Sequence, residues 1–267
     1  MTKLITQFFI FILGTTIGSF LNVLIDRLPR NESINGRSHC DYCKKKIAWY
    51  DLFPIISFFI LGGKTRCCGK KLSLQYPLIE LVTGLVFVFI MKTVFIKDSL
   101  LISLFLLGII SCFIVIFVSD LKYHLISDYL LIALFIFSLL YRVMPNLFRH
   151  PIIVNEILKQ VQNDIVLALI VALPIFLIYY FSKERAMGLG DVYLTAIMGF
   201  LLGWKAGFMA LYIAFVTGAI FGIGLIILQR KKIKSKIAFG PFLVIGTVTM
   251  LFWGERIITI IKRIYGF

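Results

Sequence analysis

Three aspartates stand at the edges of long apolar segments, where membrane helices would begin or end. Asp120 ends one apolar run, Asp128 precedes the next, and Asp191 follows Gly188 and Gly190 at the start of another. Carboxylates at membrane helix ends are costly to bury and are functional by default. Two of them a few ångströms apart cannot both ionise, so one holds a proton as general acid while the other activates a water. The pattern predicts a two-aspartate site that hydrolyses a peptide bond.

Asp120 and Asp191 are the stronger candidates for the catalytic pair. The two glycines before Asp191 let backbone approach closely and leave room for an extended substrate strand. Asp128 is better explained as the N-cap of the helix that follows, with Ser127 as the alternative cap, because a short oxygen acceptor satisfies free N–H groups. The competing interpretations are a solvated loop charge beside Lys122 for Asp120 and an N-cap for Asp191.

Four of the five cysteines lie in one polar loop, as a Cys40-x-x-Cys43 pair followed by adjacent Cys67 and Cys68. An odd count with this clustering argues against a disulfide framework and favours a metal site or reduced thiols. A CxxC pair supplies two thiolates to one tetrahedral Zn²⁺, and a second pair would close a structural site. We therefore expect a structural zinc site, with reduced and unligated cysteines as the alternative.

The segments that carry these residues are apolar enough to cross a membrane. Of 267 residues, 60% are hydrophobic and only 15% are charged, which excludes a large soluble catalytic domain because soluble domains carry about 25% charged residues. The mean hydropathy is +0.97. We predict an all-α polytopic membrane protein with about eight transmembrane helices and one cytoplasmic cysteine-containing loop. The predicted spans are 4–25, 77–91, 100–118, 129–144, 165–181, 189–204, 206–228 and 238–254.

Two apolar segments need separate interpretation. The span 4–25 is expected to be retained rather than cleaved as a signal peptide, because it exceeds the usual length of such a region and lacks an A-x-A-like site. The stretch Leu52–Leu61 is too short to span, so we expect an interfacial or packed segment of the polar loop.

Basic residues place four connecting loops on one side of the membrane. These loops carry 18 of the 28 Lys and Arg residues, so the positive-inside rule predicts that they are cytoplasmic and that Asp120 and Asp191 face the cytoplasm. The net charge of +15 then reflects loops that face membrane lipid, and nucleic-acid binding is not expected because no basic stretch outside the spans is interleaved with stacking aromatics. The loops are 26–76, 119–128, 182–188 and 229–237, the last with the basic cluster 230–236.

Five motifs, taken in order, resemble the type IV prepilin peptidases, the bifunctional leader peptidases and N-methyltransferases among the GxGD aspartyl proteases. In that family the first Asp of the upstream motif and the Asp of GxGD are catalytic, which implies Asp120 and Asp191. Asp128 occupies the other acidic position of the first motif, and Ser127 replaces the usual proline before it. The motifs are GSFLNVLIDRLPR (18–30), WYDLFPIISF (49–58), LSLQYPLIELVTG (72–84), SDLKYHLISD (119–128) and GLGD (188–191).

The resemblance implies a multi-pass aspartic endopeptidase of the bacterial inner membrane. It would remove the basic leader of type IV prepilins or pseudopilins at the cytoplasmic face and then N-methylate the new amino terminus with S-adenosylmethionine. The implied organisation is a first transmembrane helix (1–25), a cytoplasmic loop with the cysteines (26–76) and a transmembrane protease core (77–267). The basic leader and apolar helix of such a substrate would hold its scissile bond at the membrane surface, where both aspartates are expected.

The family's methyl transfer is associated with the Glu and Gly of the IELVTG motif, here Glu80 and Gly84. From its position alone, Glu80 could equally be a first-turn acid that the helix macrodipole favours after Pro77. The family also has a second CxxC pair, and Thr65 stands where its first cysteine is expected, so Cys67 is displaced. Cys40, Cys43 and Cys68 are therefore firmer ligand candidates, and His39 could substitute for Cys67.

Two alternatives to the bifunctional peptidase stay open. A transporter or channel with intramembrane proton-relay carboxylates would place its acids deep within spans and show repeat symmetry, and neither feature is visible in the sequence. A peptidase of the same family that has lost methylation would account for the altered second cysteine pair.

Overall fold

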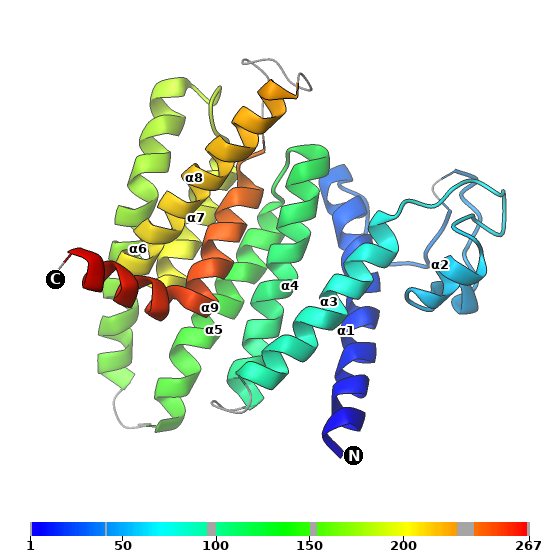
Figure 1. Ribbon diagram of the computed structural model, residues 1–267, viewed down its shortest axis with the longest axis horizontal. Helices are drawn as coiled ribbons and strands as arrows, with labels where there is room; N and C mark the ends of the chain where they lie inside the picture. Colours follow the sequence, from blue (N-terminus) through cyan, green and yellow to red (C-terminus); the bar gives the residue numbers. More distant parts are fainter. Residues whose placement is uncertain (1, 41, 95–99, 150–153, 229–237, 266–267) are drawn as a thin grey trace. The chain divides into compact units, whose positions relative to one another are not determined.

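The computed structural model is built from α-helices and describes residues 2–40, 42–94, 100–149, 154–228 and 238–265 (Figure 1). Within those residues the extended pairing consists of isolated bridges, His39 with Lys46 and Lys64 with Lys71. In the described part of the chain, seven helices are long and apolar enough to cross a membrane, and an eighth apolar helix is shorter. The predicted fold class is therefore confirmed. The helices are α1 (Thr2–Arg27), η1 (Leu28–Arg30), η2 (Trp49–Leu52), α2 (Ile56–Ile60), α3 (Gln75–Thr93), α4 (Leu100–Tyr123), α5 (Asp128–Arg149), α6 (Val154–Ser182), α7 (Leu189–Leu202), α8 (Trp204–Ile227) and α9 (Gly240–Tyr265).

The predicted span 189–204 corresponds to α7, which ends two residues earlier and is too short to cross a membrane. Its 14 residues extend only about 21 Å at 1.5 Å per residue, whereas the hydrocarbon core is about 30 Å thick. Gly203 follows the helix at φ 78°, a left-handed conformation that suits glycine, and its N–H bonds to Gly199 O at 2.9 Å. This turn leads directly into α8. The predicted basic cluster 230–236 lies outside the described residues.

The chain forms two compact units, residues 1–115 and 116–267. In the first unit α3 packs along α1. Glycines permit the close approach of these helices: a Cβ at Gly14 would lie 2.8 Å from the Cα of Gly84, and one at Gly18 would lie 2.8 Å from the Cα of Glu80.

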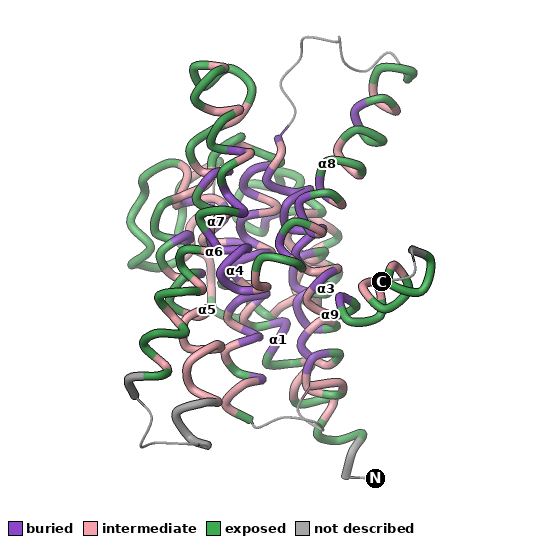
Figure 2. Tube along the Cα trace, turned by 90° about the vertical axis from the view of Figure 1, so that its left-hand side faces the viewer, coloured by how far each residue is buried: buried purple, intermediate pink, exposed green. Residues whose placement is uncertain are grey.

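In the second unit, α7 is the central element and contacts α5, α6, α8 and α9. Nine of its 14 residues are buried (Figure 2). Gly199 lets α7 approach α6 closely, because a Cβ there would lie 2.9 Å from the Cβ of Val171 and 3.0 Å from the Cα of Ala168. Backbone contacts of this kind cannot adjust by a rotamer change, so the position of α7 in the unit is set by this glycine.

We expect Gly199→Ala to lower the thermal stability of the protein in detergent. An added methyl group would force α7 away from α6, and overpacking of this kind costs about 1–3 kcal/mol. The measurement is the fraction of protein that stays monodisperse after heating, compared across a temperature series.

Gly224→Ala in α8 is the matched control, because a Cβ at Gly224 meets nothing within 4 Å. It should leave stability unchanged or raise it, since alanine is favoured over glycine in helices by about 0.5–1 kcal/mol. Equal behaviour of the two variants would show that the α6–α7 approach is not tightly packed.

Candidate active site

Asp120 lies near the C-terminal end of α4, and the residue is only 6% exposed. Its Oδ2 accepts a hydrogen bond from the backbone N–H of Gly240, the first residue of α9, at 3.0 Å. A Cβ at Gly240 would lie 2.6 Å from the same oxygen. Only glycine therefore allows this backbone N–H to reach the carboxylate.

Asp191 is the third residue of α7 and is 9% exposed. Its Oδ2 accepts a hydrogen bond from the backbone N–H of Gly188 at 3.1 Å, so the carboxylate bonds back to the residue that caps the helix. A negative charge is favoured at this end of a helix by the macrodipole. Asp191 is therefore not the N-cap considered from the sequence; it is a buried residue inside the helix that bonds back to the N-cap residue Gly188.

The two carboxylates share one neighbourhood. Figure 1 shows the end of α4 and the start of α9 at the same end of the second unit. Ile126, in the loop after α4, lies between the two glycine positions: a Cβ at Gly190 would be 3.1 Å from Ile126 Cβ, and one at Gly240 would be 3.3 Å from Ile126 Cδ1. Asp120 and Asp191 are also close enough to interact electrostatically. The structure therefore brings together the two aspartates that the sequence singled out.

Asp128 differs from this pair because it is exposed at the first residue of α5. The carbonyl of Ser127 accepts the first hydrogen bonds of the helix, from the N–H groups of Leu130 and Leu131. Ser127 therefore occupies the N-cap position, and the favoured assignment of Asp128 as the cap is corrected to the alternative. Asp128 contributes a negative charge to the first turn.

Two contributors to the site were not predicted. Gly240 lies 120 residues from Asp120 in the chain, and its N–H reaches that carboxylate only through tertiary packing. Ile126 is an ordinary apolar residue in a short polar loop. The only local signal was the glycine before Pro241 at the start of a predicted span, and this pattern marks many helix starts.

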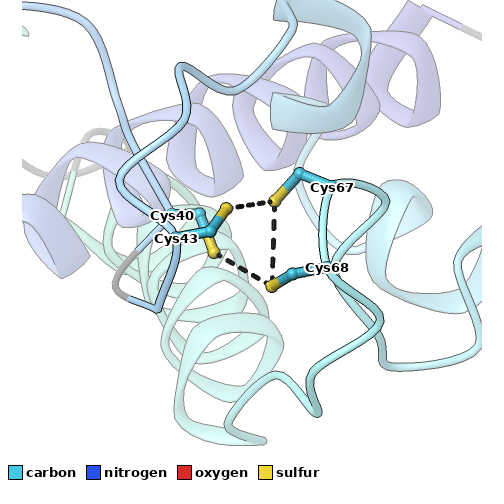
Figure 3. Close-up of side chains that lie close together, drawn as sticks. All are labelled: Cys40, Cys43, Cys67 and Cys68. Carbon is cyan, nitrogen blue, oxygen red and sulfur yellow. Dashed lines mark hydrogen bonds between the residues drawn. The ribbon is translucent and has the colours of Figure 1, made fainter.

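The four loop cysteines form a compact cluster (Figure 3). Their sulfur atoms all lie within 4.8 Å of one another, with Cys40 and Cys68 at 3.7 Å and Cys43 and Cys67 at 3.1 Å. Two backbone turns produce this arrangement: Lys44 N–H bonds to Cys40 O at 2.8 Å, and Gly69 N–H bonds to Thr65 O at 2.9 Å.

Cys67 is a full member of the cluster, although the sequence ranked it below the other three. The turn between Thr65 and Gly69 bends the backbone, so both adjacent thiols face the first pair. His39, the alternative ligand considered from the sequence, does not belong to the group of candidate metal ligands formed by the four cysteines. Hydrogen bonds from the Thr65 hydroxyl and then the Lys70 backbone lower the pKa of Cys68 to about 6, which favours the thiolate that metals bind.

Glu80 and Gly84 lie one turn apart on α3, but they face different neighbours. Glu80 is buried, and its Oε2 accepts a hydrogen bond from the backbone N–H of Ile55 at 2.7 Å. This contact stabilises Ile55 at φ 62°, a conformation that is unusual for a β-branched residue. A Cβ at Gly84 would lie 2.8 Å from Phe11 and Thr15 of α1, so Gly84 serves helix packing.

Comparison with known proteins gives matches over most of the chain. Residues 12–94 match the bacterial peptidase A24 N-terminal domain, and residues 107–223 match the type IV leader peptidase family. A prepilin leader peptidase/N-methyltransferase of Aeromonas salmonicida is 30% identical over 93% of this chain and 91% of its own length. Proteins of the same name from Bacillus subtilis and Myxococcus xanthus are 29% and 30% identical, over 94% and 80% of this chain and 95% and 62% of their own lengths. No solved structure matches.

Proposed function

Because this chain belongs to the type IV leader peptidase family, with its prepilin peptidase and N-methyltransferase activity, we propose that Asp120 and Asp191 form the catalytic dyad. The observation that carries the proposal is the convergence of two buried carboxylates, each hydrogen-bonded through one oxygen to a glycine N–H. The proposed substrates are type IV prepilins or pseudopilins, as the names of the relatives suggest.

The proposed reaction is general acid–base hydrolysis by a pair that holds one proton. The ionised carboxylate takes a proton from a water, and the oxygen of that water attacks the scissile carbonyl carbon. The protonated carboxylic acid then gives its proton to the leaving nitrogen as the C–N bond breaks. The N–H groups of the two glycines hold the carboxylates in place. Because glycine has no side chain, these residues leave free the space that an extended peptide needs.

We propose that the pair faces the cytoplasm at the inner membrane. Asp120 lies near the end of α4 and Asp191 near the start of α7, so both are at helix ends rather than at mid-span. The positive-inside rule assigns that side of the membrane to the cytoplasm. The transporter or channel alternative is set aside, because it required acids deep within spans and because the chain belongs to a peptidase family.

Asp120→Asn and Asp191→Asn should each abolish leader removal. The amide is nearly isosteric and can accept the glycine N–H, but it cannot share the proton of the pair, and general acid–base roles are worth about 10²–10⁴ in rate. The test is a gel-shift assay of prepilin processing by purified variants in detergent at matched concentrations.

Asp128→Asn is the control for that assay and should retain most of the activity, because Asp128 is exposed at the start of α5. Efficient cleavage by either dyad variant would reject the two-aspartate mechanism. An inactive Asp128 variant would instead show that the wrong acid of the first motif had been assigned.

We propose that Glu80 acts in methyl transfer and that Gly84 contributes by positioning α3 against α1. S-adenosylmethionine, when bound, supplies an electrophilic methyl group for the new amino terminus of the substrate. The fit of the chain to this cofactor is partial: Glu80 offers a buried carboxylate that could orient an amine and take its proton, whereas Gly84 is covered by Phe11 and Thr15. Glu80 is therefore the residue to test.

Glu80→Gln should remove methylation and leave cleavage intact. The amide oxygen can still accept the Ile55 N–H, so the loop should keep its attachment to α3, but the side chain can no longer take a proton. Mass spectrometry of a prepilin incubated with the variant and S-adenosylmethionine should show a product that has lost its leader and gained no methyl group. A fully methylated product would remove Glu80 from the proposed reaction.

We propose that the four loop cysteines bind one structural Zn²⁺. A tetrahedral ion with Zn–S bonds of about 2.3 Å requires sulfur–sulfur separations of about 3.8 Å. The separations of 3.7 Å between Cys40 and Cys68 and 4.0 Å between Cys67 and Cys68 fit this geometry, whereas Cys43 and Cys67, at 3.1 Å, would have to move apart to bind the ion. All four thiols lie in one cluster despite the altered spacing of the second cysteine pair. This argues against the alternative that the altered pair marks a peptidase that has lost methylation.

Purified protein should contain about one Zn²⁺ per chain by elemental analysis. Cys40→Ser and Cys67→Ser should each reduce that content, because every thiol of the cluster is a candidate ligand. Cys112→Ser is the matched control and should keep the metal, since Cys112 is buried in α4 outside the cluster. Zinc-free protein with full activity would support unligated thiols instead.

A further inference from the structure

An exposed apolar surface covers the short helices η2 and α2 in the polar loop. Trp49, Phe59 and Ile60 are 74%, 72% and 74% exposed. Trp49 makes edge-on ring contacts with Tyr50 and Phe53, at centroid distances of 5.8 and 5.9 Å. Large exposed apolar patches mark contact with a membrane or another molecule. We call this surface the aromatic platform, and it consists of Trp49, Tyr50, Phe53, Ile56, Phe59 and Ile60.

The loop that carries the platform is basic, and one of its cations, Arg66, contacts a platform residue. The guanidinium of Arg66 lies 5.3 Å from the centre of the Tyr50 ring and forms an ion pair with Asp51 at 2.9 Å. The Lys70 ammonium lies 5.9 Å from the centre of the Tyr42 ring, which belongs to the same loop but not to the platform. Segment 26–76 contains ten Lys and Arg residues against four Asp and Glu. An apolar surface bordered by positive charge is complementary to anionic phospholipid.

The attachment of the platform to α3 sets its depth in the membrane. Ile55 lies within the platform segment, and its N–H is held by Glu80, five residues after the start of α3 at Gln75. At 1.5 Å per residue this contact is about 7.5 Å along the helix axis. Because α3 is long and apolar enough to span, the platform lies level with the first turns of a membrane helix. Trp and Tyr side chains concentrate at this interfacial depth.

We propose that the aromatic platform inserts into the headgroup region of the membrane and that the neighbouring basic residues bind anionic phospholipid. The cysteine-containing loop is then held against the lipid surface by two attachments, the Glu80 contact and the platform. A basic prepilin leader is a poorer occupant, because the positive charge around the platform would repel it. The proposal does not depend on the catalytic roles of Asp120 and Asp191.

The test uses the full chain with Trp204→Phe and Trp253→Phe, which leaves Trp49 as the sole tryptophan. The protein is reconstituted into phosphatidylcholine–phosphatidylglycerol vesicles in which the phosphatidylcholine is brominated near the headgroup or near the chain end. Trp49 fluorescence should be quenched more strongly by the shallow bromines. Replacing phosphatidylglycerol with unbrominated phosphatidylcholine, at a constant fraction of brominated lipid, should weaken this quenching.

A second set of variants tests the platform itself. Phe59→Ser combined with Ile60→Ser should reduce the shallow quenching of Trp49. Ile34→Ser should leave it unchanged, because Ile34 is an exposed apolar residue of the same loop outside the platform. Trp253 as the sole tryptophan checks that bromolipid quenches a residue of a spanning helix.

Three outcomes would overturn the proposal. The first is Trp49 fluorescence that is unaffected by either bromolipid while Trp253 is quenched. The second is quenching that does not depend on phosphatidylglycerol, which would reject the anionic-lipid contact. The third is Trp49 emission that is insensitive to bromolipid but shifts when prepilin is added, which would identify the platform as a substrate-docking surface.

Discussion

The burial of the short helix α7 among four longer helices is the constraint on which the candidate active site depends. Nine of its 14 residues are buried, and its contact with α6 at Gly199 leaves no room for a side chain. A helix enclosed in this way cannot slide along its axis without separating backbone contacts. The carboxylate of Asp191, at its N-terminal end, is therefore fixed in depth, next to Asp120 at the end of α4.

Among the residues that the structure describes, backbone N–H groups rather than basic side chains hold the two carboxylates. Burial of an unpaired carboxylate is strongly unfavourable. Each hydrogen bond to a charged group stabilises the folded protein by about 1.5–3 kcal/mol. Gly188 and Gly240 supply these bonds without a positive charge that would lock both acids in the ionised form. A pair that must hold one proton between two carboxylates needs this kind of neutral support.

Local patterns in the sequence predict most of the fold and part of the site. Apolar runs predict the helices, and acids at the edges of those runs predict Asp120 and Asp191, because both signals lie within a few residues. The predicted end of α7 was two residues too late, because the apolar run continues across Gly203 into α8. The contact of Gly240 with Asp120 and that of Glu80 with Ile55 join residues far apart in the chain. Such contacts depend on packing that no local pattern encodes.

A double-variant cycle on the two aspartates tests the dyad most directly. Residual prepilin cleavage would be measured under single-turnover conditions, with enzyme in excess, for the Asp120→Asn and Asp191→Asn variants and for the chain that carries both changes. If the two carboxylates act as one unit, removal of either disables both, and the double variant should be no slower than the slower single variant. A double variant whose loss equals the product of the two single losses would show that the aspartates act independently, and would contradict the dyad.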